Sequence, residues 1–144
     1  MHSILQPLNL DASPMVLPVA GSSVRAGFPS PADDWSQERI DLTKLLIPHP
    51  ACTFLVKSGG LSMKDAGIDD GDLLVVDRYM KPEHKSIVVA VLDNDFTVKY
   101  LFKRGGRIKL QAANPTFPDI SIGDEQTLEI WGVVTCSIKR FVKV

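Results

Sequence analysis

Ser62 stands in a sequence context that can support nucleophilic chemistry. It follows two glycines in the run Gly59-Gly60-Leu61-Ser62-Met63. Glycine lets the backbone adopt angles that other residues avoid and lets a substrate approach closely. A serine on such a turn can present its hydroxyl beside backbone N–H groups, which are the nucleophile and the oxyanion donors of acyl transfer. The same pattern is also typical of an ordinary loop. A nucleophilic serine also needs a general base.

The three histidines do not supply an obvious base. His2 lies near the N-terminus, His49 lies between two prolines, and His84 follows a polar turn. None of them belongs to an apolar pattern that would hold the ring rigidly, so we expect solvated histidines. A Ser/His/Asp triad therefore has little support in this sequence.

Lys99 is the alternative base, because it interrupts the apolar run from Phe96 to Phe102. Strand alternation places Lys99 on one face together with Thr97 and Leu101. Taken alone, this periodicity favours a lysine that faces solvent on a half-exposed strand. The catalytic alternative requires burial, because desolvation lowers the pKa of an amine and only the neutral amine can accept the serine proton.

The elements around these two residues have the pattern of a β domain. Six runs have the length and composition of strands, namely 53–57, 73–77, 86–92, 96–102, 107–112 and 128–134. The residues from Asp69 to Asp72 and from Asp93 to Asp95 have the composition of turns, and the second turn would close a hairpin. We therefore predict a mostly β fold of short strands, with Ser62 in a loop and Lys99 within a strand.

The first 31 residues differ from the rest of the chain. They hold five of the ten prolines and only two charged side chains, together with many aliphatic ones. Proline blocks regular helix, so we predict a flexible, proline-rich arm. Its apolar side chains favour docking on its own domain or on a partner, and the alternative is a poorly ordered terminus. We place the arm at residues 1–32 and the β domain at residues 33–144.

A short connecting segment follows the arm. Its charged residues between Asp33 and Arg39 indicate a solvated stretch. Asp41 is a good N-cap, so a helix of one or two turns is expected to begin after it. Pro48 and Pro50 end that helix, because proline cannot continue it.

Composition excludes several classes of protein. The 144 residues are 44% hydrophobic with a formal net charge of −1, which fits one folded domain. This charge argues against a strongly electrostatic nucleic-acid binder, and we expect no direct sequence-specific DNA binding. The sequence has no apolar run of 18 residues and no signal peptide, so we expect a cytoplasmic protein without a membrane span. Cys52 and Cys136 form no zinc motif and are expected as small core residues, although a disulfide stays open. Neither a metal nor a cofactor is expected.

Several ordered blocks of the sequence resemble one family. The stretch from Ala26 to Ala32 is similar to the cleavage-site region of UmuD-type proteins, the mutagenesis relatives of LexA in the S24 family of self-cleaving peptidases. The likeness runs from about Arg25 to Val134 through the blocks 37–42, 45–47, 49–50, 54–57, 62–68, 70–77 and 96–99. Ordered blocks of this kind are more specific than any one motif.

This resemblance implies a fold and a set of site residues. The fold would be a LexA/signal-peptidase-like β domain with a Ser/Lys dyad. Ser62 would be the nucleophile, Lys99 the general base, and Ala26–Gly27 the bond that is cut. The backbone N–H groups of Ser62 and Met63 would hold the oxyanion, and Gly60 would let the substrate strand approach closely.

One position departs from the family pattern. The family usually carries an acidic residue immediately before the serine, where this chain has Leu61. The leucine removes a charge and a hydrogen-bond acceptor beside the site. We expect it to alter the binding of the arm or of a partner, while the dyad itself is retained.

The resemblance also implies a biological role. The chain would be a bacterial SOS-response protein that removes its own arm once, when an activated RecA filament on single-stranded DNA favours the productive pose. The cut form would be a homodimer and an accessory subunit of an error-prone Y-family polymerase in translesion synthesis.

Rival interpretations come from other classes. One is a catalytically silent β domain that binds polymerase or RecA partners, with Leu61 as the sign of lost activity. A LexA-like repressor would need a helix-turn-helix domain, and the residues before Gly27 are too few for one. A signal-peptidase-like enzyme that acts in trans would need a membrane anchor, which we do not find.

Overall fold

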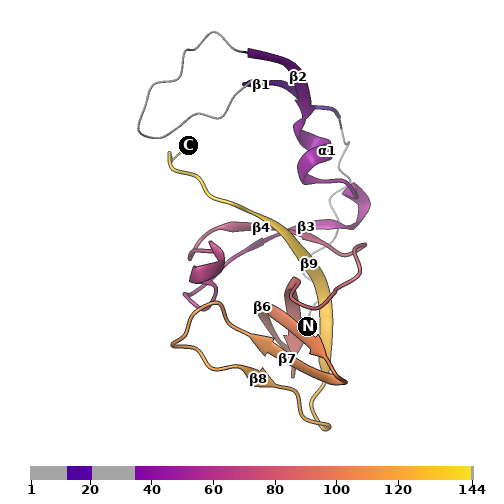
Figure 1. Ribbon diagram of the computed structural model, residues 1–144, viewed down its shortest axis with the longest axis vertical. Helices are drawn as coiled ribbons and strands as arrows, with labels where there is room; N and C mark the ends of the chain where they lie inside the picture. Colours follow the sequence, from indigo (N-terminus) through magenta and orange to yellow (C-terminus); the bar gives the residue numbers. More distant parts are fainter. Residues whose placement is uncertain (1–12, 21–34, 144) are drawn as a thin grey trace.

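The strands of the computed structural model form two antiparallel sheets (Figure 1). The structure describes residues 13–20 and 35–143, and for residues 35–37 it describes the backbone alone. The small sheet pairs β1 (Val16–Ala20) with β2 (Trp35–Asp41). The large sheet has the order β3-β4-β9-β5-β6-β7-β8. Its strands are β3 (Thr53–Lys57), β4 (Leu73–Asp77), β5 (Ile87–Leu92), β6 (Asp95–Arg104), β7 (Arg107–Gln111), β8 (Ile120–Ser121) and β9 (Leu128–Ile138).

The mostly β fold and the six predicted strands are confirmed. The strands β3 and β4 have the predicted bounds, and the others differ by a few residues at their ends. The strand β9 runs to Ile138, four residues beyond the predicted end. Its pairing shifts register opposite Val75 and Val76 of β4 and opposite Val89 and Ala90 of β5. Such bulges bend a strand, so β9 can pair with both of its neighbours along its length.

The predicted turn between β5 and β6 is also confirmed. Leu92 pairs with Asp95, so only Asp93 and Asn94 form the loop. Both loop residues have positive φ, 48° and 72°. Two left-handed residues define the type I′ turn, whose twist matches that of the strands it joins. This hairpin fixes the register of β6 and therefore the position of Lys99.

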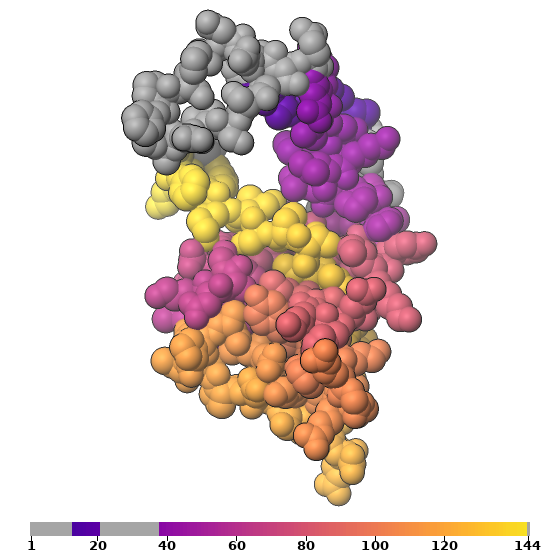
Figure 2. All heavy atoms as spheres, in the orientation of Figure 1, coloured from indigo at the N-terminus to yellow at the C-terminus, as the bar shows by residue number. Residues whose placement is uncertain are grey.

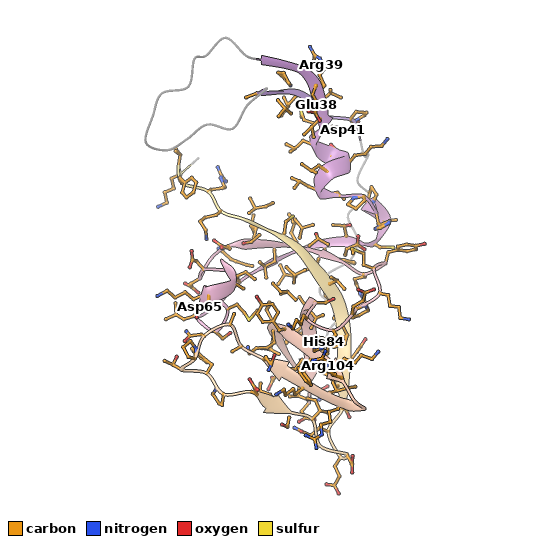
Figure 3. The ribbon with its side chains drawn as sticks, in the orientation of Figure 1. Glu38, Arg39, Asp41, Asp65, His84 and Arg104 are labelled. Carbon is orange, nitrogen blue, oxygen red and sulfur yellow. The ribbon has the colours of Figure 1, made fainter. Side chains whose placement is uncertain are left out.

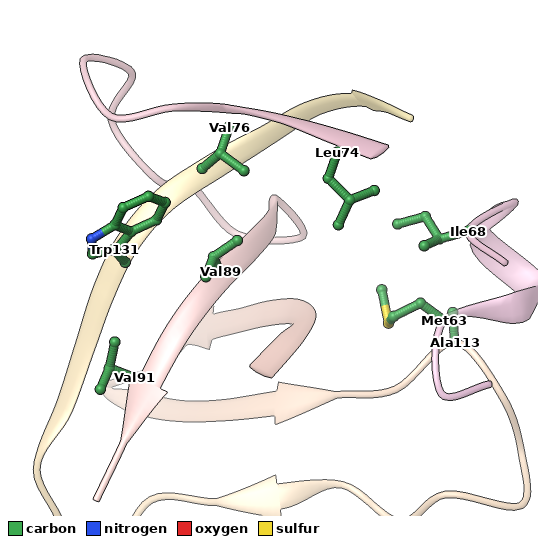
Figure 4. Close-up of a cluster of buried hydrophobic side chains, with 8 residues drawn as sticks. All are labelled: Met63, Ile68, Leu74, Val76, Val89, Val91, Ala113 and Trp131. Carbon is green, nitrogen blue, oxygen red and sulfur yellow. The ribbon is translucent and has the colours of Figure 1, made fainter. Parts of the chain in front are cut away.

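Hydrophobic side chains cover both faces of the large sheet. The cluster in Figure 4 holds Met63, Ile68, Leu74, Val76, Val89, Val91, Ala113 and Trp131. A second cluster holds Val88, Ala90, Leu101 and Leu110. Alternate residues of β5 enter opposite clusters, so the middle of the sheet is apolar on both sides.

The small sheet joins part of the proline-rich arm to the segment that follows it, which agrees with docking of the arm on its own chain. Residues predicted as a solvated stretch form part of β2, and part of the proline-rich arm pairs with them as β1. The register shifts between Pro18 and Ala20, which fits proline in a strand that has only one neighbour. The proposed division at residue 32 runs between these two paired strands and stays a prediction.

The predicted short helix is confirmed as α1 (Leu42–Leu46). Its N-cap is Asp41, whose Oδ1 accepts N–H bonds from Thr43 at 3.0 Å and from Met15 at 3.1 Å. These backbone bonds, with the one from Met15 first, lower the pKa of Asp41. Figure 2 shows α1 and the small sheet projecting from the body of the molecule, and the turn η1 (Pro50–Cys52) leads from them into β3.

The two cysteines are free thiols, so the structure forms no disulfide between them. Each is half-buried, whereas the sequence predicted core residues. In the described ranges, no helix has the length and apolar character needed to cross a membrane.

Candidate active site

Ser62 and Lys99 meet in space although they are 37 positions apart in the chain. Lys99 Nζ lies 3.1 Å from Ser62 Oγ. Ser62 stands in the loop between β3 and the short turn η2 (Lys64–Ala66), and Lys99 stands on β6 directly opposite Val88 of β5. The structure therefore brings together the two residues that the sequence singled out.

Lys99 is buried, so the solvent-facing orientation that periodicity alone favoured is wrong, and the burial that the catalytic alternative requires is present. Its side chain is 9% exposed. The alternation itself is correct, because Leu101 on the same face is also buried. The second hydrophobic cluster covers this face, and periodicity within one strand does not show such a covering layer.

Neutral oxygen atoms surround the Lys99 amine. Nζ lies 2.7 Å from Thr97 Oγ1 and 3.1 Å from the carbonyl oxygen of Val98, besides its contact with Ser62. No carboxylate of the described residues forms an ion pair with it. Burial therefore acts without compensation and lowers the pKa of Lys99. A lysine in this setting is suited to be a proton acceptor.

Contacts from two distant segments hold the Ser62 loop. Gly60 has φ of +82°, a conformation that glycine adopts without strain. Its N–H donates to Asp70 Oδ1 at 2.7 Å. On the other side, Asn114 Nδ2 donates to the carbonyl of Leu61 at 2.9 Å, and Ala113 N–H donates to the carbonyl of Ser62 at 2.8 Å. The serine is thus presented by a loop fixed at both ends.

The candidate oxyanion donors differ in availability. The Gly60 N–H is occupied by Asp70. The N–H groups of Ser62 and Met63 donate to no acceptor within the described part of the chain. Met63 is anchored, because its side chain is 3% exposed within the larger hydrophobic cluster. Two unoccupied donors next to the serine can stabilise negative charge that develops there.

Two surface clefts flank the Ser62–Lys99 pair. One, of about 280 Å³, lies along β6 and the glycine pair and includes Val56, Gly60, Phe96 and Val98 in its lining. The other, of about 350 Å³, is walled by Leu61, Phe117, Pro118 and Ile120. Both clefts include Ser62 and Lys99 in their linings. An extended peptide can therefore cross the pair, with room for side chains on either side.

The histidines have structural partners, so the expectation of solvated rings is wrong for two of them. His49 Nδ1 lies 2.6 Å from Oδ2 of the buried Asp77, and its ring packs on Tyr79 at 4.4 Å. His84 Nδ1 accepts the backbone N–H of Lys103. Neither ring lines the clefts beside Ser62. His2 lies outside the described residues.

Three residues of the site were not predicted from the sequence. Thr97 was not identified, although strand alternation had placed it on the face of Lys99. Asn114 gave no signal in the sequence, and Asp70 was assigned only to a turn. Ala26 and Gly27, the predicted cleavage site, lie outside the described residues. Within the described ranges, no three residues of metal-binding type gather to form a metal site.

Comparison with known proteins places this geometry in context. Residues 18–135 match the model of a family described as Peptidase S24-like. The chain is 45% identical to protein MucA of Salmonella typhimurium over 116 residues, which are 80% of this chain and 79% of MucA. It is 42% identical to protein ImpA of Escherichia coli over 125 residues, 87% of this chain and 85% of ImpA. It is 37% identical to a LexA repressor of Verminephrobacter eiseniae over 92% of this chain and 58% of that repressor.

Proposed function

Because this chain belongs to the Peptidase S24-like family, we propose that it is a serine endopeptidase that cuts its own backbone between Ala26 and Gly27. Ser62 is the nucleophile and Lys99 the general base. The observation that carries this proposal is the 3.1 Å contact between Lys99 Nζ and Ser62 Oγ. The amine is buried and forms no ion pair with a carboxylate in the part of the chain that the structure describes.

The oxygens around Lys99 orient its lone pair. A neutral amine has two N–H donors and one lone pair. The Val98 carbonyl can only accept a hydrogen bond, and Thr97 Oγ1 can accept the other N–H. The lone pair then faces the hydroxyl of Ser62 and can take its proton. Thr97 and Val98 thus act as positioning residues for the base.

The reaction follows acyl transfer. The Ser62 oxygen bonds to the carbonyl carbon of Ala26, its proton moves to Lys99, and the negative carbonyl oxygen is held by the N–H groups of Ser62 and Met63. The Lys99 ammonium then gives its proton to the nitrogen of Gly27 as the C–N bond breaks. Water, deprotonated by Lys99, hydrolyses the acyl-enzyme and frees Ser62.

Cleavage would remove one partner of the small sheet. The fragment before Gly27 contains β1, whose residues pair with β2. It also contains Met15, which exchanges hydrogen bonds with Leu42 and Asp41 at the start of α1. Each copy cuts one bond, so the reaction works as a switch that changes the contacts of β2 and α1. Faster amide hydrogen exchange in β2 after cleavage is the expected signature.

The biological role that we propose is an SOS switch in the bacterial cytoplasm. An activated RecA filament on single-stranded DNA would favour the productive pose, and the cut homodimer would serve an error-prone Y-family polymerase as an accessory subunit. The family resemblance of the sequence supports this part of the proposal, and no contact residue is assigned to these partners.

The test is intact-mass spectrometry of the purified full chain at about pH 10, where lysines begin to lose their proton. Wild type is compared with Ser62→Ala and Lys99→Ala. A new fragment that begins at Gly27, formed only by wild type, is the expected result. A chain that stays whole, also with RecA filament added, would contradict the proposal and leave a binding module.

A further inference from the structure

The end of the β6–β7 hairpin carries a concentrated positive charge away from Ser62. Residues 103–109 include four basic side chains and no acidic one, in a chain whose formal net charge is −1. Figure 3 labels Arg104 in the β6–β7 part of the molecule, far from the small sheet. Charge gathered on one element of an otherwise slightly acidic chain points to an anionic partner.

The pairing register places three of these cations on one face. Arg104 lies directly opposite Arg107, and Phe102 lies opposite Lys109. Because side chains alternate along a strand, these four residues share a face, and Lys103 belongs to the other. Like charges directly opposite each other destabilise a strand pair. The two arginines are therefore placed where an anion between them would relieve repulsion.

Only one of the three cations has a counter-charge. Lys109 Nζ lies 3.0 Å from Asp119 Oδ2 and 4.6 Å from the centre of the Phe102 ring. Arg104 and Arg107 are both exposed. Neither forms an ion pair or a side-chain hydrogen bond with any residue in 13–20 or 35–143. Two adjacent guanidinium groups are thus available to a ligand.

A groove of about 650 Å³ lies on this part of the hairpin. Arg104, Gly105, Gly106 and Arg107 border its tip, Lys109 and Ser121 lie behind them, and no carboxylate lines it. The two glycines have φ of +59° and +74°, so the tip turns without side chains that would block the groove. The lining combines these hydrogen-bond donors with the apolar side chains of Phe102, Ile108 and Ile122.

We propose that this groove binds the backbone phosphate groups of nucleic acid, with Arg104 and Arg107 as the principal contacts. The guanidinium fork matches phosphate oxygens in geometry and in charge. Ser121 and Lys109, whose amine also contacts Asp119, line the same groove. Phosphate contacts carry no base information, so binding is independent of sequence. The proposal stands apart from the peptidase proposal, because it uses none of the residues around Ser62.

The test measures binding of the full chain to a short labelled oligothymidylate by fluorescence anisotropy. Arg104→Ala with Arg107→Ala is compared with Lys44→Ala and Lys64→Ala, which remove the same charge from exposed sites elsewhere. We expect the arginine pair variant to bind about tenfold weaker or worse at low salt. The slope of log K against log salt should fall in magnitude by about 1.4, since each phosphate contact on a single strand contributes about 0.7.

Further arms identify the ligand. The double variant Arg104→Lys with Arg107→Lys should keep the salt slope and bind the oligothymidylate more weakly. It keeps both positive charges but loses the planar guanidinium fork. Equal losses in the two alanine pairs, or absence of binding by wild type, would overturn the proposal. Displacement of the oligothymidylate by poly-glutamate at equal charge would also overturn it, in favour of an acidic protein. Binding of inorganic phosphate without binding of the oligothymidylate would overturn the assignment of nucleic acid as the ligand. A melting temperature as high as that of wild type shows that each variant is folded.

Discussion

The side-chain amines of Lys99 and Lys139 both contact nearby oxygen atoms. The oxygens around Lys99 are neutral, and those around Lys139 belong to carboxylates. Lys99 Nζ contacts three neutral oxygens between 2.7 and 3.1 Å away. Lys139 Nζ contacts the carboxylates of Asp69 at 2.7 Å and Asp72 at 2.6 Å. Burial lowers the pKa of Lys99, whereas hydrogen bonds to Asp69 and then Asp72 raise the pKa of Lys139. The charge of the partners and the access of water, more than the count of contacts, decide which lysine can be a base.

Lys139 supports the surroundings of Ser62 indirectly. Lys139 ties the end of β9 to the turn that contains Asp69 and Asp72. The same turn carries Asp70, which holds the N–H of Gly60 two residues before Ser62. Lys139 thus stabilises the loop that presents Ser62, the proposed nucleophile, while Lys99 forms no ion pair with a carboxylate of the described residues.

The largest expected effect separates the two lysines directly. Lys99→Ala should lower the rate of self-cleavage by about 10⁴-fold, as expected when a general base is removed. Lys99→Arg should fail equally, because guanidinium does not lose its proton. Lys139→Ala should keep cleavage measurable at neutral pH. Intact-mass time courses give the three rates, and loss of cleavage only in Lys139→Ala would reverse the assignment.

A second change should make Lys99 resemble Lys139. Thr97→Asp places a carboxylate beside Nζ, which raises the pKa of Lys99 and reduces its neutral fraction. We expect cleavage at neutral pH to slow by roughly 10- to 1,000-fold, the effect of an opposite charge within a few ångströms. Raising the pH should recover most of the rate. Thr97→Val is the control, because it removes the acceptor without adding charge and should leave the pH profile in place.

The loop contact of Asp70 should have a smaller effect. Asp70→Ala removes the acceptor for the Gly60 N–H and should slow cleavage by about tenfold, in the range of one lost hydrogen bond. Asp70→Asn retains an acceptor oxygen and should restore most of the rate. The melting temperature of both variants distinguishes local loosening from unfolding. Equal rates for Asn and Ala variants would show that the hydrogen bond does not position Ser62.

Stability against pH should show the smallest effects, with opposite signs for the two lysines. The pKa of Lys99 is lower in the folded chain, so the unfolded chain binds more protons below the ordinary lysine value and wild-type stability rises with pH there. Lys99→Met should therefore be more stable than wild type at neutral pH and lose that advantage as pH passes 10.5, the ordinary value.

Lys139 has the reverse dependence. Its folded pKa is raised, so its stabilising effect is present at neutral pH and is lost as pH rises through the folded pKa. Lys139→Met should therefore unfold more easily than wild type at neutral pH. Urea unfolding midpoints across pH measure both variants, and parallel shifts of the same sign would contradict the comparison.

The sequence predicted the framework of the site better than its environment. The strand from Phe96 to Phe102 and its alternation correctly placed Thr97 and Leu101 on the face of Lys99. The burial of that face could not be predicted, because it depends on Leu110 of β7 and other residues of the second cluster. Periodicity in one strand shows which residues share a face but does not show what packs against that face.

Other features lacked a local signal. No strand was predicted in the proline-rich arm, yet β1 forms because β2 pairs with it. The strand β8 has two residues, too few for a pattern. Asn114 reaches Leu61 from 53 positions away, so no spacing near the serine identifies it. Contacts between distant segments, which hold the nucleophile loop in place, become visible only in the folded chain.

The most direct test of Lys99 as the general base is an NMR titration of Lys99 and Lys139 in the same sample. The Ser62→Ala variant with labelled lysine side chains keeps the chain whole during the experiment. We expect Lys99 to lose its proton below pH 10.5, the ordinary pKa of lysine, and Lys139 to lose its proton above it. A Lys99 that titrates at or above Lys139 would contradict its role as the general base.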